Sequence, residues 1–320
     1  MALPPDIFKR LSRLNRRLAR DRLTTGDRVG PGDERGAGAA VPPGGPPDGP
    51  DAAADALTLE RLIPGSERRA AGGRFYSVAR RAEEFRPPPG RSDPGDVVDG
   101  PELLARYRRV LFGAGQAAPT DDLSEPLQAL VRAPPTAVRY LDIETCGLAG
   151  EPLFLVGLMR YDGTTLRVDQ FLARDYSEEQ AILHQFWAEA GRAACLVTFN
   201  GKTFDLPTIA ARSAACGLLR VPELPVHVDL LHESRRRWKR AVPNCRLQTL
   251  EEWICGRRRF GDIAGCDIPA AYHEFVRALR AGDAVRRARS LRRLQTILHH
   301  NALDLVTMAE LVTHLLSSRA

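Results

Sequence analysis

The sequence predicts an α/β protein in which helices flank a mixed β-sheet. From about residue 124 onward, strand-like apolar runs and helical patterns follow one another in the order β-β-β-α-β-α-β-α. An Asp162-Gly163 pair joins two of these runs, and this dipeptide is typical of the turn in an antiparallel hairpin. The later runs alternate with helical segments. Together these observations indicate a mixed sheet with helices on its faces.

Five apolar segments are the predicted strands of this sheet. They are residues 138–144 (VRYLDIE), 152–162 (PLFLVGLMRYD), 165–173 (TLRVDQFLA), 195–200 (CLVTFN) and 225–231 (PVHVDLL). The fourth segment ends at Asn200-Gly201, a dipeptide that marks a tight turn before the next element. We therefore expect a five-stranded sheet.

Three helices are predicted between and after these strands. The first runs from Ser177 to about Ala190, with Ser177 as its N-cap and Gln180 three residues later. The second runs from about Thr203 to Cys216 and stops at Gly217. The third lies within 298–316 and carries apolar residues at helical spacing, and several further helices complete the chain.

The chain divides into three regions by its composition. Residues 1–56 are a basic segment, with a short amphipathic helix over 5–23, followed by a linker rich in Gly, Pro and Ala. The linker has almost no large apolar side chains and is predicted to be disordered. Residues 57–123 are predicted to be a small, partly ordered extension, and residues 124–320 the main domain. The basic segment is a candidate for recruiting a protein partner.

The overall composition indicates a globular protein with an anionic partner. Of the 320 residues, 27% are charged and 43% are hydrophobic, values that are ordinary for such proteins. The formal net charge of +6 favours an anionic partner without specifying which. No apolar run of membrane-spanning length is present, so no membrane span is expected. The six cysteines form no CxxC pair, which predicts reduced thiols and a cytoplasmic location.

The first candidate site lies at the end of the first strand, where Asp142 and Glu144 are two residues apart. On an extended backbone, such residues point to the same face. Two carboxylates held together repel each other unless a cation lies between them, and hard oxygen ligands suit Mg²⁺ or Mn²⁺. The alternative is a strand end with two solvated acids, and for an isolated pair that interpretation is the better one.

The second candidate site is the sequence FNGKTFD at 199–205. Asp205 lies near the start of the second helix, where the helix dipole favours an acid whatever its function. In the functional interpretation, Asp205 meets Asp142 and Glu144 at the carboxyl edge of the sheet. Asn200, the amides of the Gly201 turn and the neighbouring Lys202 would then bind a phosphate, and Phe204 would either stack on a base or fill the core.

The third candidate site is Asp304 in the last helix, with His299 and His300 before it. If the helix already includes residue 299, His300 lies within about 40° of Asp304 around the helix axis and His299 about 140° away. If Asn301 caps the helix instead, His299 lies in a loop and is able to reach the site. A lone His-Asp pair on a helix is more often structural, but here the acid joins three others.

Two basic runs are candidate nucleic-acid contacts. The run RRRWKR at 235–240 includes Arg236, Trp238 and Lys239, and the run RRRF spans 257–260. In both, cations are placed to contact phosphates while an aromatic ring stacks on a base. The alternative for each run is a solvated helix face.

The motifs DIET, FNGKTFD and HHNALD, in this order, resemble the three motifs of the DEDD 3′–5′ exonuclease superfamily. The stretch NCRLQTLEEWICGRRRFGDIAGCDIPAAYHEFV, followed by HNALD, is similar to the YprB-type ribonuclease H-like family of predicted exonucleases. The resemblance covers about 135–318. It implies a ribonuclease H-like fold and a phosphodiester hydrolase acting on single-stranded 3′ ends of DNA or RNA.

The resemblance also implies roles for individual residues. It makes four acids the ligands of two divalent ions, Mg²⁺ or Mn²⁺, held about 4 Å apart around the scissile phosphate; these are Asp142, Glu144, Asp205 and Asp304. A histidine would take the proton from the attacking water. The superfamily uses His five residues before the last Asp or Tyr four before it, and this chain has His at both positions. We favour His300 as this base, with His299 as its rival.

Two other functions are compatible with the motifs. The first is a nucleic-acid-binding module that kept the fold and lost the chemistry, although an intact set of four acids argues against it. The second is an endonuclease of the ribonuclease H type, which cleavage of circular substrates would separate from end-directed hydrolysis.

Overall fold

The computed structural model describes residues 58–84, 98–112, 122–147, 150–259, 261–281 and 283–317. All of these residues belong to one compact unit, Gly49–Ala320. The predicted helix over 5–23, the linker over 29–56 and the partner-binding role of this region lie outside the described residues. Within the described part of the chain, no helix combines the length and hydropathy that crossing a bilayer requires.

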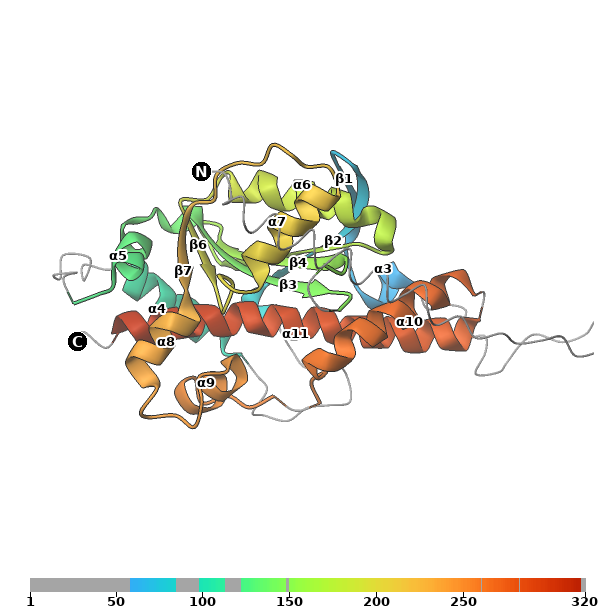
Figure 1. Cartoon of the computed structure of the whole chain (residues 1–320). Coiled ribbons are helices and arrows are strands. Elements are labelled where there is room, and N and C mark those ends of the chain that lie inside the picture. Colours follow the sequence, from blue (N-terminus) through green and yellow to red (C-terminus); the bar gives the residue numbers. More distant parts are fainter. Residues whose placement is uncertain are drawn as a thin grey trace, which may run out of the picture. The chain divides into compact units, whose positions relative to one another are not determined.

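A seven-stranded mixed sheet forms the centre of the protein (Figure 1). Its spatial order is β1-β2-β5-β4-β3-β6-β7. The strands are β1 (Ser66–Ala70), β2 (Gly73–Arg81), β3 (Val138–Thr145), β4 (Leu153–Tyr161), β5 (Leu166–Leu172), β6 (Cys195–Thr198) and β7 (Val226–Asp229). In this spatial order, each pair of neighbouring strands from β1 through β2, β5 and β4 to β3 is antiparallel. Strand β6 pairs parallel with β3 and with β7. The predicted fold class is confirmed.

The sheet has two strands more than predicted, and both come from residues 66–81. Gly72 and Gly73 have φ values of +90° and +138°, which lets the chain reverse between β1 and β2. Strand β1 is an edge strand, and four of its five residues are exposed. This polar edge strand lacks the apolar run by which the other strands were recognised, so the hairpin escaped prediction.

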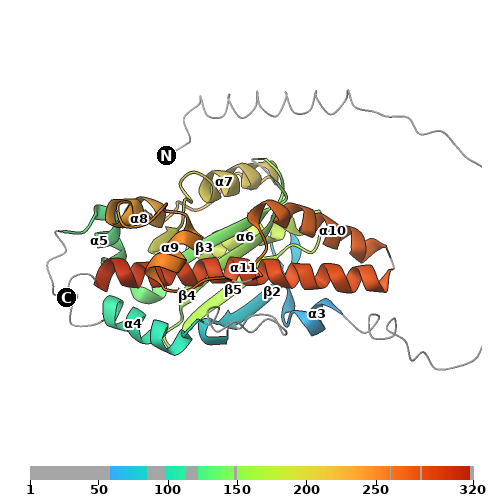
Figure 2. The same cartoon turned by 90° about the horizontal axis from the view of Figure 1, so that it is seen from below.

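Helices cover both faces of the sheet (Figures 1 and 2). Helices α6 and α7 lie over one face, and α11 crosses the opposite face in contact with β3, β4 and β5. The α-helices are α3 (Leu59–Leu62), α4 (Gly100–Phe112), α5 (Glu125–Arg132), α6 (Glu179–Ala190), α7 (Asp205–Ala215), α8 (Leu230–Trp238), α9 (Leu247–Ile254), α10 (Ile268–Arg280) and α11 (Ala284–Ser317). Short 3₁₀ helices are η1 (Ala82–Glu84), η4 (Pro135–Ala137), η5 (Tyr176–Glu178) and η6 (Gly265–Asp267).

One predicted helix start is wrong, and one of the two alternatives for the last helix is excluded. Ser177 does not cap α6: the Asp175 carboxylate accepts the Ser177 N–H at 2.9 Å and its hydroxyl at 2.5 Å, and η5 precedes α6. Asn301 does not cap the last helix, because α11 is 34 residues long and continues through it. Both histidines before Asp304 therefore lie inside a continuous helix.

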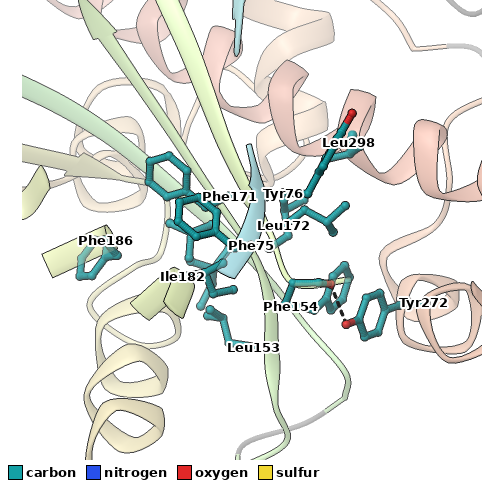
Figure 3. Close-up of a cluster of buried hydrophobic side chains, with 14 of the residues drawn as sticks. Phe75, Tyr76, Leu153, Phe154, Phe171, Leu172, Ile182, Phe186, Tyr272 and Leu298 are labelled. Atoms are coloured by element: carbon teal, nitrogen blue, oxygen red, sulfur yellow. Dashed lines mark hydrogen bonds between the residues drawn. The ribbon is translucent and has the colours of Figure 1, made fainter. Parts of the chain in front are cut away.

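The core on the α6 side joins the additional hairpin to the rest of the domain (Figure 3). Phe75 of β2 packs edge-on against Phe171 of β5, with ring centroids 5.6 Å apart. Phe154 of β4 stacks on Tyr272 of α10 at 3.9 Å between ring centroids, and the Tyr272 hydroxyl donates to the Ala173 carbonyl at 2.8 Å. These aromatic contacts hold α10 and β2 on the same sheet that carries the candidate site.

Candidate active site

Asp142 and Glu144 lie near the end of β3, half-buried, at positions that share one face of the sheet. Burial raises the pKa of each carboxyl well above its usual range, and the negative charge of Asp304 raises both further. The charge of Asp205 has the same effect on both. The fold therefore brings the four acids named by the motifs within electrostatic reach of one another.

Asp205 is the first residue of α7, and it is buried. Burial raises its pKa to about 7; main-chain hydrogen bonds at Asp205 itself and at Ile143 oppose that rise, whereas the charges of Asp229 and Asp304 add to it. The Asp205 carboxylate accepts a main-chain hydrogen bond at Ile143, so the start of α7 contacts the end of β3. A strand end and a helix start thus meet at the carboxyl edge of the sheet, as expected.

Asp304 makes a close ion pair with Arg259, with 2.5 Å between its Oδ1 and the arginine Nη2. The same guanidinium donates from Nε to Glu251 Oε2 at 2.8 Å and from Nη1 to Asp262 Oδ2 at 3.2 Å. Only 5% of the Arg259 side chain is exposed. One buried arginine therefore joins the acid of the third motif to α9 and to the segment before α10.

Two of the three arginines in the second basic run are not available for the predicted nucleic-acid contact, whereas Arg258 between them is exposed. Arg257 and Arg259 are both buried against acids: Arg257 pairs with Glu251 at 2.9 Å and with Glu310 at 2.6 Å. Buried guanidinium groups with carboxylate partners are not available to phosphates. Phe260, the aromatic residue of this run, lies outside the described residues.

The two histidines have different surroundings because they lie on different sides of α11. His300 Nδ1 is 2.7 Å from Asp262 Oδ2, and its Nε2 is 3.6 Å from Asp304 Oδ2. Burial lowers the pKa of His300, but the charges of Asp304 and Asp262 outweigh burial, so the pKa is raised. Burial and the nearby Arg80 lower the pKa of His299 to about 4.

Asp262 contributes to the site although the motifs did not indicate it. It accepts from Arg259 and is hydrogen-bonded to His300, so one carboxylate holds both the arginine and the imidazole. A carboxylate on Nδ1 leaves Nε2 as the ring nitrogen that faces Asp304. Because Asp262 is about forty residues from His300 in sequence, spacing alone offered no signal for this pair.

The amides of the Asn200-Gly201 turn are not a phosphate cradle, contrary to prediction. The N–H groups of Asn200 and Lys202 donate to the Asp229 carboxylate at 2.8 and 3.0 Å, and the Gly201 N–H donates to Thr198 Oγ1 at 3.2 Å. Asn200 has φ +64°, a left-handed conformation that asparagine tolerates in turns. Protein acceptors already satisfy these donors, so any phosphate contact here would come from side chains.

Phe204 and the α8 run present side chains toward solvent. Phe204, next to Asp205, is 40% exposed, so it does not fill the core. Arg236 and Lys239 are exposed, and Arg236 pairs with Glu233 at 3.3 Å. Trp238 is half-buried and packs against the second core cluster. The cations of this run are accessible to an anionic partner, whereas the indole is partly used in packing.

The donor chemistry of the acid cluster fits a hard divalent cation. The charge of Asp304 raises the pKa of the other three carboxylates, and a cation would neutralise such a set of four acids. Among the described residues, however, no three acids, histidines or cysteines are arranged as the ligands of one ion. Asp304, which influences the other three acids, is paired with Arg259.

Sequence comparisons relate the chain to known proteins. The sequence model of the RNase_H superfamily matches residues 139–316. The uncharacterized protein YprB of Bacillus subtilis (strain 168) is 34% identical over 181 residues, which are 55% of this chain and 41% of YprB. The chain thus matches less than half of that relative's length.

One solved structure to which the chain shows a distant likeness is the family B DNA polymerase of the hyperthermophilic archaeon Pyrobaculum calidifontis. It has 15% sequence identity and a TM-score of 0.38, and the match covers 78% of this chain and 48% of the polymerase. The superfamily match spans β3 to α11 and includes every acid of the cluster. The chain belongs to the RNase_H superfamily.

Proposed function

We propose that this protein is a metal-dependent nuclease that hydrolyses phosphodiester bonds at the 3′ ends of DNA or RNA. One observation carries the proposal: the negative charge of Asp304 raises the pKa of Asp142, Glu144 and Asp205, so four acids from three separate motifs lie close together at one edge of the sheet. Keeping four acids together without a cation costs stability. The candidate ligands are Asp142, Glu144, Asp205 and Asp304.

Divalent ions such as Mg²⁺ or Mn²⁺, when bound by these acids, would supply Lewis-acid stabilisation of the scissile phosphate and lower the pKa of a water. The protein's own residues would do the rest. His300, held through Nδ1 by Asp262, is placed to accept the proton of the attacking water at Nε2. His299 is the weaker candidate because it lies on another side of α11.

The exposed ring of Phe204 beside Asp205 would stack on a terminal base, and Asn200 and Lys202 would contribute side-chain contacts to the phosphates. The exposed Arg236 and Lys239 of α8 would extend the binding surface, with Trp238 at its margin. These contacts involve phosphates and base faces, so they do not discriminate between deoxyribose and ribose.

A second candidate function is a nucleic-acid-binding module without catalysis. The observation that favours it is the Arg259–Asp304 ion pair, which occupies one of the four acids. Catalysis requires that Asp304 leaves Arg259 for a cation, whereas binding alone does not.

The deciding experiment is degradation of 5′-labelled single strands of DNA and RNA by the full chain with Mg²⁺ or Mn²⁺. We expect stepwise shortening from the 3′ end, and a loss of at least about 100-fold in D142N, because removing an ion ligand costs several kcal/mol of transition-state stabilisation. The matched control is D162N in the β4–β5 turn, where Asn-Gly serves as well as Asp-Gly.

Each alternative has its own outcome in this assay. Binding of the strands without cleavage by the wild type, at any Mg²⁺ or Mn²⁺ concentration, would establish the non-catalytic module. Cleavage of circular strands would establish an endonuclease. Equal cleavage by the wild type and D142N would show that the acid cluster is not the active site.

A further inference from the structure

A row of three residues crosses the sheet directly beneath α11. Asp142 of β3 is paired with Gly157 of β4, and Gly157 is paired with Gln170 of β5. Directly opposed residues on neighbouring strands share one face, so Asp142 and Gln170 stand on the same side, roughly 10 Å apart across two strand spacings. Gly157, which has no side chain, leaves a gap between them.

The side chain of Asn301 from α11 fills this gap, and it is completely buried. Its Nδ2 donates to Asp142 Oδ2 at 2.7 Å and to the Asp142 carbonyl at 3.2 Å. Its Oδ1 accepts from Gln170 Nε2 at 2.8 Å, and the same Nε2 donates to the Leu298 carbonyl at 2.7 Å. Because Gln170 donates to both acceptors, the amide of Asn301 has one orientation, with its nitrogen toward Asp142.

Gly157 is required for this contact. A Cβ atom at position 157 would lie 2.9 Å from Asn301 Cγ and closer still to its Oδ1. Such an atom would push the amide away from the sheet. The glycine and the asparagine are therefore two halves of one contact, supplied by β4 and by α11.

The contact has two consequences for the acid cluster. It holds one oxygen of Asp142, and no hydrogen bond among the described residues uses the other oxygen, Oδ1. It also seats α11 on the sheet at residue 301, and Asp304 lies three residues later, on the neighbouring turn of the same helix surface. A neutral amide orients a carboxylate without cancelling its charge, in contrast to the arginine that faces Asp304.

We propose that Asn301 is a positioning residue of the acid cluster, which orients Asp142 and holds Asp304 opposite it and so sets the affinity of the site for a divalent cation. This inference rests on the proposed function. Partners of metal ligands in other sites change metal affinity or activity by about 10- to 100-fold when they are replaced.

The test measures Mn²⁺ binding to the full chain in the absence of nucleic acid. The electron paramagnetic resonance signal of free Mn²⁺ reports how much of the ion remains unbound. We expect N301L and G157A each to raise the Mn²⁺ dissociation constant about 10- to 100-fold. N301L removes the amide at similar size, whereas G157A keeps the amide and displaces it. The Mn²⁺ dissociation constant of the double variant should not exceed the larger of the two single-variant values, because both substitutions disrupt the same contact.

S290A is the matched control. Ser290 is a buried polar residue of the same helix, roughly 16 Å before Asn301, and its hydroxyl donates to the Arg287 carbonyl. The Mn²⁺ dissociation constant of S290A should stay within about twofold of the wild-type value, since Ser290 makes no contact with the acid cluster. Circular dichroism melting shows which variants are folded, and G157A keeps the test decisive if N301L does not fold.

The outcomes separate this inference from the function on which it rests. If the wild type binds Mn²⁺ and D142N does not, but N301L and G157A bind as the wild type does, Asn301 is only structural and the inference is overturned. If the wild type binds no Mn²⁺ at millimolar concentrations, the proposed metal-dependent function fails and the inference falls with it. Weakened binding in both variants with an unchanged S290A supports it.

Discussion

Two arginine-rich segments of this protein look alike in sequence and lie in opposite environments. The run at 235–240 includes the end of α8, and its cations are exposed; among the described residues, its one ion pair joins Arg236 to Glu233. In the run at 257–259, Arg257 and Arg259 have 5% of their side chains exposed and pair with acids. A nucleic acid can reach the first run and not these two guanidinium groups.

The difference depends on acids that come from other helices, two of which are distant in sequence. Glu251 comes from α9, and Glu310 and Asp304 come from α11, more than forty residues after the arginines they contact. Among the described residues, no acids from later helices form ion pairs with the run at the end of α8. Clustered arginines therefore predict contacts with anions, and the fold decides whether those anions are phosphates of a ligand or buried carboxylates of the protein.

The largest effect that tests this comparison is on stability. R259M should lower the free energy of unfolding by about 3–5 kcal/mol, because it leaves buried carboxylates without their cation. Urea unfolding followed by circular dichroism measures the change. The matched change in the exposed run, R236M, should stay within about 0.5 kcal/mol. Equal effects of the two substitutions would show that the two runs do not differ energetically.

A second prediction uses an acid that, unlike Asp304, has no ion-pair partner among the described residues. The pKa of Asp205 is raised to about 7, so its ionisation opposes folding: the stability it contributes is complete below its unfolded pKa and is lost as pH rises toward 7. In EDTA, the free energy of unfolding of D205N relative to that of the wild type should therefore increase from pH 5 to pH 8 by on the order of 1–3 kcal/mol.

Urea unfolding at several pH values measures this gain. Mg²⁺ should reduce the difference, because a bound cation stabilises the ionised carboxylate of the wild type. A difference between the two proteins that does not change with pH would mean that Asp205 is ionised in the folded protein as easily as in water.

The smallest expected effect concerns the exposed run. R236Q/K239Q should weaken binding of a single strand and reduce the slope of log affinity against log salt by about 0.7 for each phosphate that the variant no longer neutralises. Fluorescence anisotropy at several NaCl concentrations measures the slope. R192Q is a suitable control, because Arg192 is 68% exposed and pairs with a glutamate three residues away, as Arg236 does. An equal slope change in R192Q would remove any special role of α8.

The fold was largely predictable because its central strands are strongly apolar. The runs that became β4 and β5 pair antiparallel through the predicted Asp-Gly turn, whereas those that became β3 and β6 pair parallel, so the sheet is mixed. The β1–β2 hairpin was missed, since β1 is a polar edge strand whose place depends on contacts such as that of Phe75 with Phe171. The Ser177 cap failed because Asp175, two residues earlier, accepts both the N–H and the hydroxyl of Ser177 and caps the preceding η5.

The candidate site was predictable in its acids and not in their partners. Residue spacing placed Asp142 and Glu144 together, and the helical period separated His300 from His299 once α11 was known to be continuous. The roles of these residues in catalysis stay predictions. Arg259, Asp262 and the Asn301 amide contact the site from segments with no shared spacing, and no local pattern indicates them.

Local chemistry in the sequence alone determined the mixed α/β class, the order of the central strands along the chain and the four candidate acids. These depend on side-chain polarity and on periods of two and 3.6 residues, which each short segment carries by itself. Only the tertiary structure decided which arginines are buried, which histidine faces Asp304 and what holds Asp142. Those outcomes depend on hydrogen bonds and ion pairs between distant segments, whose geometry exists only after the chain has packed.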